Sequence, residues 1–235
     1  MKFLTMDTST ELMSVAVGID DQVFHDEGAG GAQSSAHLIA MVMLVLKQAG
    51  IGLKDLNAIV FSHGPGSFTG LRTACAVSQG LALGADLPVI GIDSLLAMAQ
   101  NAKSEHPQFN RFLSLMDARM NQMYAGAYEW HNNQWSMAMA PVLIEPQQLS
   151  WPAHWHDDDH KRVCGNAFAA HQTHIGNELK LLSDPIYSLP NALALLTLAP
   201  HTWRNGHAMD PDQAFPVYIR DKVAQTTAER NQASL

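Results

Sequence analysis

The start of the chain alternates apolar and polar positions in three short runs, which is the period of two that β-strands show. The runs cover Lys2–Thr8, Met13–Ile19 and Gln22–Glu27, and Asp20-Asp21 is a turn between the last two. Because the connections are short, we expect neighbouring strands to pair antiparallel. The pattern therefore predicts a three-stranded antiparallel start.

Longer apolar segments follow, with the length and the flanking residues of helices. We expect Ser34-Ser35 to cap the first helix and Gly50 to end it. The predicted elements in order are a helix to Gln48, a strand over Leu56–Ser62, a helix over Phe68–Ala85, a strand over Pro88–Ile92 and a helix from Ser94. Since a helical crossover makes the next strand parallel, the order βββαβαβα predicts a mixed sheet.

A polar stretch around Pro107 separates this part from the rest, so we predict two domains, 1–106 and 107–235. The second part has a weaker pattern. Its predicted elements are strands at Arg111–Met116, Met123–Trp130 and Met137–Ile144, a helix at Asn191–Trp203, and a last segment, Ala214–Val223, that packs back on the body.

A short internal repeat supports that division. Met6-Asp7 is followed by Met13 at the same spacing at which Met116-Asp117 is followed by Met123, an offset of 110 residues. Each copy is an apolar strand, an aspartate, a polar turn and a second strand. Duplication predicts two related domains, but a match this short also arises by chance, and both explanations stay open.

Composition narrows the class of protein. The chain has 235 residues, 47% of them hydrophobic, and a formal net charge of −8. Its first residues form no apolar signal run, so we expect no secretion, and its longest near-apolar stretch, Ala36–Leu46, is too short to span a bilayer. Cys75 and Cys164 lie in unrelated contexts, which argues against a disulfide framework. We expect a soluble, cytoplasmic protein. Because its charge repels phosphate, RNA, if it is involved, is expected to be held by another protein.

The segment Gly64–Arg72 is a glycine-rich turn between a strand and a helix. Such a turn can present backbone N–H groups to an anion, or it can pack a helix tightly against a strand. It lacks the ending of a Walker loop. The candidate phosphate-facing residues, together with the two strand-end aspartates, are Asp7, Gly64, Gly66, Ser67, Thr69, Gly70 and Asp117. Each aspartate can alternatively cap its own turn.

We predict no metal site and no catalytic residue. His37 has Met41 one helical turn later, so a two-histidine pair is missing, and the histidines of 154–160 fit no familiar ligand spacing. Cys75 has no base nearby in sequence and is expected to be a buried thiol.

Two predicted helices have unusual surfaces. Leu38–Leu46 is apolar on every face, and Ala76, Gly80 and Gly84 form a ridge of small residues. Either loops of this chain or another subunit must cover them. The candidate partner-interface residues are His37, Met41, Leu44, Ala76 and Gly80.

Five segments together resemble the TsaB (YeaZ) family. They are Phe3–Ser9, Ser35–Leu38, Gly64–Arg72, Met116–Arg119 and Pro216–Arg220, and they span the whole chain in order. The resemblance implies an α/β, actin-like (ASKHA, ribonuclease H-like) fold of two related domains, each a mixed sheet with flanking helices.

The resemblance also implies a function. The family is homologous to TsaD, the catalytic subunit, whose first helix carries a metal-binding histidine pair. Only His37 stands here, which implies a non-catalytic scaffold for threonylcarbamoyl transfer to adenosine 37 of tRNAs that read ANN codons. Family members pair with TsaD through the first two helices, bind TsaE together with it, and form homodimers alone. No cofactor is then required by this chain, and ATP or ADP would lie at the subunit junction.

Two other functions remain as alternatives. A free-standing actin-like ATPase or kinase would use Asp7, Asp117 and 64–70 to hold nucleotide phosphates. The family has also been labelled an M22-type glycoprotease, but the sequence displays neither metal ligands nor a base beside a nucleophile.

Overall fold

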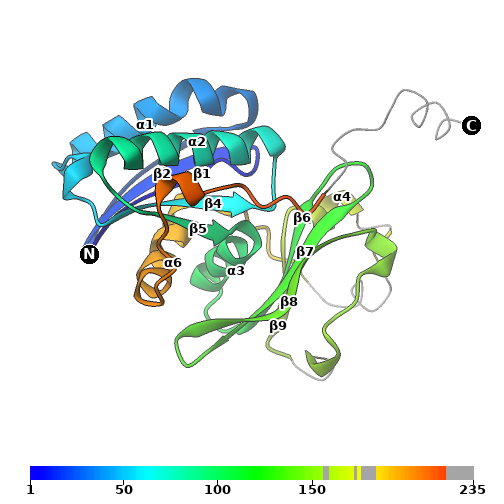
Figure 1. Cartoon of the computed structure of the whole chain (residues 1–235). Helices are drawn as coiled ribbons and strands as arrows, with labels where there is room; N and C mark the ends of the chain where they lie inside the picture. Colours follow the sequence, from blue (N-terminus) through cyan, green and yellow to red (C-terminus); the bar gives the residue numbers. More distant parts are fainter. Residues whose placement is uncertain (156–158, 172–173, 176–183, 221–235) are drawn as a thin grey trace, which may run out of the picture.

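The computed structural model describes residues 1–155, 159–171, 174–175 and 184–220. Two mixed sheets lie side by side, and most of the helices pack on the first (Figure 1). The predicted class is confirmed: the fold is α/β, with two related mixed sheets and flanking helices. No helix in these ranges is long and apolar enough to cross a membrane.

The first sheet has the order β3-β2-β1-β4-β5. Its strands are β1 (Lys2–Asp7), β2 (Leu12–Ile19), β3 (Gln22–Ala29), β4 (Ala58–Gly64) and β5 (Val89–Asp93). The first three pair antiparallel, and β4 and β5 add in parallel, as the short turns and the helical crossovers predict.

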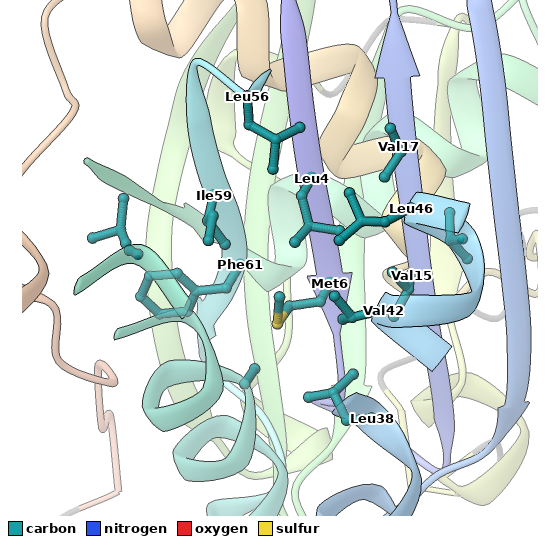
Figure 2. Close-up of a cluster of buried hydrophobic side chains, with 14 of the residues drawn as sticks. Leu4, Met6, Val15, Val17, Leu38, Val42, Leu46, Leu56, Ile59 and Phe61 are labelled. Atoms are coloured by element: carbon teal, nitrogen blue, oxygen red, sulfur yellow. The ribbon is translucent and has the colours of Figure 1, made fainter. Parts of the chain in front are cut away.

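Helices cover both faces of this sheet. They are α1 (Ser34–Ala49) and α2 (Phe68–Ala85) on one face, and α3 (Ser94–Glu105) and α6 (Ala192–Arg204) on the other. The strand period decides the two cores: Leu4 and Met6 point to α1 and α2 (Figure 2), whereas Phe3 packs with α6. Because both faces are covered, every residue of β1 after Lys2 is buried, and so are all residues of β4 except His63.

The second sheet has the order β8-β7-β6-β9. Its strands are β6 (Arg111–Asp117), β7 (Met123–His131), β8 (Gln134–Ile144) and β9 (Lys161–Gly165), and the short helix α4 (Ala167–His171) follows. Single 3-10 turns lie at Gly31–Gln33, Leu53–Asp55, Pro146–Gln148, Ala153–Trp155 and Pro211–Gln213.

The two sheets share one connection scheme. Each begins with an antiparallel hairpin and then adds a parallel strand beside the first strand of that hairpin. The added strands β4 and β9 both end in a glycine with φ +127°, Gly64 and Gly165. The registers differ, because Asp7 pairs with Ser14 whereas Asp117 pairs with Met123. The repeated spacing therefore marks related hairpins whose turns differ by one residue. The domain boundary between 106 and 107 stays a prediction.

Three local predictions were wrong or incomplete. Ser34 does not cap α1: its N–H donates to Gly31, and the helix continues directly from the preceding 3-10 turn. The residue at the cap position is Gln33, which makes no side-chain bond there. Strand β8 starts at Gln134, before the predicted Met137, and β9 and α4 were not predicted.

Candidate functional site

A cleft of about 410 Å³ lies where the two hairpin turns face each other. One wall is the turn 9–11 with the glycine loop 66–68, and the other is the turn 116–120. Gly31, Tyr124, Asn166 and Arg220 complete the lining. The cleft thus lies between the sheets, at the ends of β1 and β6.

The glycine loop is packed backbone against backbone. A Cβ atom on Gly70 would lie 1.8 Å from the carbonyl oxygen of Thr8, and one on Gly66 would lie 2.6 Å from that of Ser9. The N–H of Ser67 donates to the Ser9 carbonyl at 2.7 Å. Glycine is therefore required at these two positions by the close approach of β1's end to the start of α2.

The loop's donors are partly used within the protein. Ser67 is the N-cap of α2, and its Oγ accepts from the N–H of Gly70 at 3.4 Å. The Thr8 hydroxyl donates to the Gly70 carbonyl at 2.6 Å. These bonds favour the tight-packing interpretation of the motif, and phosphate binding by the loop stays a prediction.

Asp7 lies inside the protein and does not line the cleft. Its carboxylate accepts the Ser9 hydroxyl at 2.9 Å and the Ser9 N–H at 3.2 Å. Burial raises the pKa of Asp7 from 3.8 to about 6, although the bonds from Ser9 lower it in part. In this structure Asp7 holds the first turn together and has no access to a ligand in the cleft.

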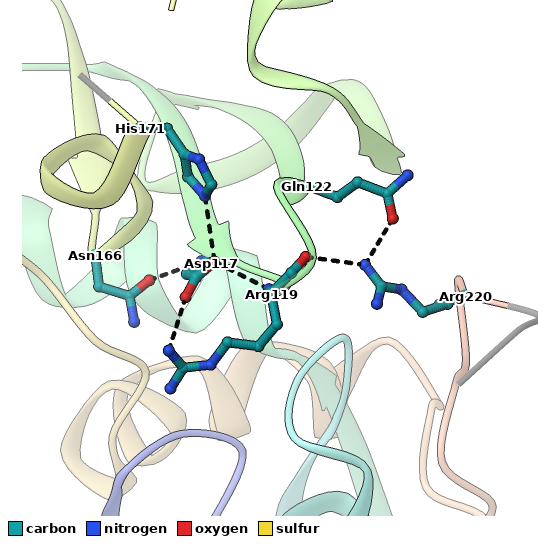
Figure 3. A network of polar contacts seen from close by, with 6 residues as sticks. All are labelled: Asp117, Arg119, Gln122, Asn166, His171 and Arg220. Carbon is teal, nitrogen blue, oxygen red and sulfur yellow. Dashed lines mark hydrogen bonds and ion pairs between the residues drawn. The ribbon is translucent and has the colours of Figure 1, made fainter. Parts of the chain in front are cut away.

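Asp117 has the matching position in the second hairpin but a different environment (Figure 3). Its Oδ1 accepts the Arg119 N–H at 2.9 Å and lies 3.2 Å from Nε2 of His171. Its Oδ2 pairs with the Arg119 guanidinium at 3.3 Å, and its own N–H donates to Asn166 at 2.9 Å. Asp117 therefore organises the cleft wall rather than standing free in it.

The turn after Asp117 has an unusual backbone. Arg119, Met120 and Asn121 have φ values of 62°, 55° and 56°, the left-handed region that residues with a Cβ seldom adopt. Arg220 holds this turn, donating to Gln122 Oε1 at 2.7 Å and to the Arg119 carbonyl at 3.3 Å (Figure 3).

The predicted phosphate-facing residues are thus divided. Gly66, Ser67 and Asp117 line the cleft. Asp7, Gly64, Thr69 and Gly70 do not. Sequence reasoning assigned no role to Asn166 or His171, which reach the cleft wall through the unpredicted strand β9 and helix α4.

The second predicted surface, on α1 and α2, is exposed. Its apolar side chains and their exposed fractions are Ile39 at 52%, Met43 at 54%, Leu44 at 44% and Leu83 at 78%. His37, Ala76 and Gly80 are also exposed, whereas Met41 is half-buried against the core. A Cβ added to Gly80 or Gly84 would meet open space. No described part of the chain covers this face, so the alternative of coverage by the chain's own loops finds no support in those ranges.

Among the described residues, possible metal ligands are not grouped, and the cysteines are buried. Within the described ranges no three His, Cys, Asp or Glu side chains are grouped to hold a metal ion. Residues 156–158 of the histidine-rich segment lie outside those ranges. Cys75 is buried, as predicted; burial raises the pKa of its thiol, whose Sγ donates to the Ala214 carbonyl at 3.3 Å.

The chain is similar to proteins named for the threonylcarbamoyladenosine modification of tRNA. Residues 29–228 match the family model described as TsaD, tRNA N6-adenosine threonylcarbamoyltransferase. The tRNA threonylcarbamoyladenosine biosynthesis protein TsaB of Escherichia coli is 32% identical, over 95% of this chain and 96% of that protein. Its counterpart in Haemophilus influenzae is 33% identical, over 95% of each.

Solved structures agree. A crystal structure from Pseudomonas aeruginosa, described as an uncharacterized protein with similarity to peptidase YEAZ, superposes with a TM-score of 0.84 at 30% identity, covering 93% of this chain and 99% of that one. The structure of YeaZ from the same organism gives a TM-score of 0.81 at 30% identity, covering 92% and 99%.

The first prediction concerns the glycine loop. Gly70→Ala should destabilise the protein by at least about 3 kcal/mol, because its Cβ would overlap the rigid Thr8 carbonyl. Gly80→Ala is the matched control on the same helix, where the Cβ meets nothing, and it should stabilise by up to about 1 kcal/mol. Urea unfolding of both variants measures this. Equal stabilities would show that the loop is not close-packed.

The second prediction concerns pH. Because the pKa of Asp7 is raised to about 6, the folded state binds a proton that the unfolded state has lost, and stability falls as pH rises from about 4 to above 6. Asp7→Asn removes this term while its amide oxygen still accepts from Ser9. Between pH 5 and 7.5, wild type should lose about 1 kcal/mol more than Asp7→Asn in urea unfolding. Parallel curves for the two proteins would contradict the raised pKa.

Proposed function

The chain belongs to the TsaB (YeaZ) family, and from this we propose that it is the accessory subunit that supports formation of threonylcarbamoyladenosine in tRNA. The proposed reaction is transfer of threonylcarbamoyl to adenosine 37 of tRNAs that read ANN codons, with the chemistry performed by TsaD. This chain acts as a scaffold in the cytoplasm, bound to TsaD and, with it, to TsaE. Alone, it forms a homodimer through the same face.

The exposed face of α1 and α2 is the observation that carries the proposal. Leu44 and Leu83 project from neighbouring helices beside a ridge of small residues that lets another helix approach closely. Ile39 and Met43 extend the apolar surface along α1. A partner that covers these exposed apolar side chains removes them from water, and this favours association.

An accessory role agrees with the chemistry of the described residues. His37 is exposed on α1 and the next turn presents Met41, so this helix offers one imidazole where a metal site needs several ligands. Asp7 is enclosed and bonded to Ser9, and the thiol of Cys75 is kept protonated by burial. Under this proposal the chain needs no cofactor of its own, and ATP or ADP binds at the junction with its partners.

The third prediction tests the partner face. Leu44→Arg should weaken binding to TsaD from the same cell by roughly a hundredfold, because an arginine buried without a partner keeps its desolvation cost. Ala76→Arg should do the same from the neighbouring helix. Leu193→Arg is the matched control: Leu193 is 39% exposed, close to the 44% of Leu44, but it lies on α6, across the sheet. Sedimentation of each variant, alone and mixed with TsaD, measures both self-association and pairing.

Other outcomes would overturn the proposal. If wild type does not bind TsaD at any concentration, the proposed pairing is wrong. If Leu193→Arg weakens pairing as strongly as Leu44→Arg does, the face on α1 and α2 is not the interface. ATP binding by the isolated chain, with hydrolysis abolished by Asp7→Ala, would instead support a free-standing ATPase.

A further inference from the structure

Residues 214–220, here called the strap, run as non-helical chain from the core beneath α2 to the turn of the second hairpin (Figure 1). The strap therefore contacts a helix of the first sheet and a hairpin of the second. Its contacts fall into three groups: with the body of α2, with the first turn of α2, and with the turn 118–122.

The first group anchors the strap to α2. Ala214 is buried in the core of the first sheet, and its carbonyl accepts the Cys75 thiol at 3.3 Å and the Gln79 amide at 3.0 Å. Gln79 donates to the Pro211 carbonyl as well, also at 3.0 Å. This end is fixed to successive turns of one helix.

The second group holds the beginning of α2. The N–H of Val217 donates to the His63 carbonyl at 2.7 Å, at the end of β4. The Tyr218 ring packs on Phe68 with centroids 5.2 Å apart, and its hydroxyl accepts from Nε of Arg72 at 2.9 Å. The Arg72 guanidinium stacks 3.8 Å over the same Phe68 ring, so the three side chains contact one another in one cluster.

The third group of contacts holds the turn of the second hairpin. Ile219 packs against the core cluster of the second sheet that contains Tyr124. Arg220 then donates to Gln122 and to the Arg119 carbonyl, at 2.7 and 3.3 Å. These bonds fall on the turn with three successive left-handed residues, which persists only where its surroundings hold it.

We propose that the strap couples the first turn of α2 to the turn 118–122, so that a change at one is transmitted to the other. Tyr218 and Arg220 are two residues apart on one non-helical segment, and each bonds to a different end of the path. The turn 118–122 is the element that responds, because its left-handed backbone relaxes when Arg220 is withdrawn.

The same path reaches the partner face. A groove of about 450 Å³ beside α2 is lined by Phe68, Arg72 and Ala76, among others. A partner seated on α1 and α2 would press on Phe68 and Arg72, and so on the strap. Through it, binding on that face changes the shape of the cleft wall. This extension rests on the proposed function, whereas the coupling within the chain does not.

The fourth prediction is made on the isolated chain by amide hydrogen exchange. Tyr218→Ala removes the contact with α2 and should speed exchange in the turn 118–122 roughly fivefold, although Tyr218 bonds to α2 and not to that turn. Arg220→Ala should speed exchange there and also at 68–72. Phe215→Ala is the matched control, a strap aromatic that is 69% exposed, and it should change neither.

Hydrogen exchange in this turn can be measured because two of its amides are hydrogen-bonded: the N–H of Ala118 donates to the Gln122 carbonyl, and the N–H of Gln122 donates to the Arg119 carbonyl. Unchanged exchange in β1 and β4 confirms that each variant is folded; if Tyr218→Ala is not, Tyr218→Phe, which loses only the bond from Arg72, replaces it. If the Tyr218 variant speeds exchange at 68–72 alone and leaves 118–122 as in wild type, the strap transmits nothing and the inference is wrong.

Adding TsaD then separates this inference from the proposed function. Slower exchange at 118–122 in wild type, absent in the Tyr218 variant at saturating TsaD, would extend the coupling to the partner. Binding that leaves 118–122 unchanged in wild type would refute that extension. A failure of TsaD to bind would refute the proposed function, while the result on the isolated chain stands.

Discussion

Two stretches of backbone, at Thr8–Ser9 and at Gly66–Gly70, lie so close together that no side chain fits between them. The arrangement of the rest depends on this contact, because it sets where α2 begins and how that helix lies on β1 and β4. The outer side of α2 contributes Leu83 and the small residues to the exposed apolar face, and its first turn borders the cleft. Both surfaces are therefore held in place by the same backbone contact.

The elements that could be predicted are those that bury a clear periodic pattern. In β1, Leu4 and Met6 face one helix layer while Phe3 faces the other, and the resulting period of two is visible in the sequence. Strand β9 escaped prediction because it is short and begins with Lys161, a buried lysine whose Nζ donates to the Trp155 carbonyl. The misassigned cap has a similar origin: a local rule pointed to Ser34, but the turn before it already supplied the bond.

The candidate site could be predicted only in part from the sequence. Asp7 and Asp117 share a motif and a strand position, yet one is enclosed by its own turn and the other lies in a network with His171 and Asn166. That difference arises from Asn166 and from His171 in α4, which lie some fifty residues further along the chain. Distant partners of this kind leave no trace in the local pattern, and Arg220, although part of a recognisable segment, shows its role only where the strap reaches the second hairpin.

The open ridge of small residues on α2 has a consequence for how a cell keeps this protein. Gly80 and Gly84 leave the backbone uncovered beside Leu83, which is 78% exposed. An unpaired copy therefore exposes an apolar surface of the kind that chaperones and proteases recognise. Paired copies hide that surface when the proposed partner occupies it. Under the proposed function, surplus copies that pair with themselves through the same face hide it too, so removal would act on unpaired monomers only, and pairing of either kind would lengthen the life of the chain in the cell.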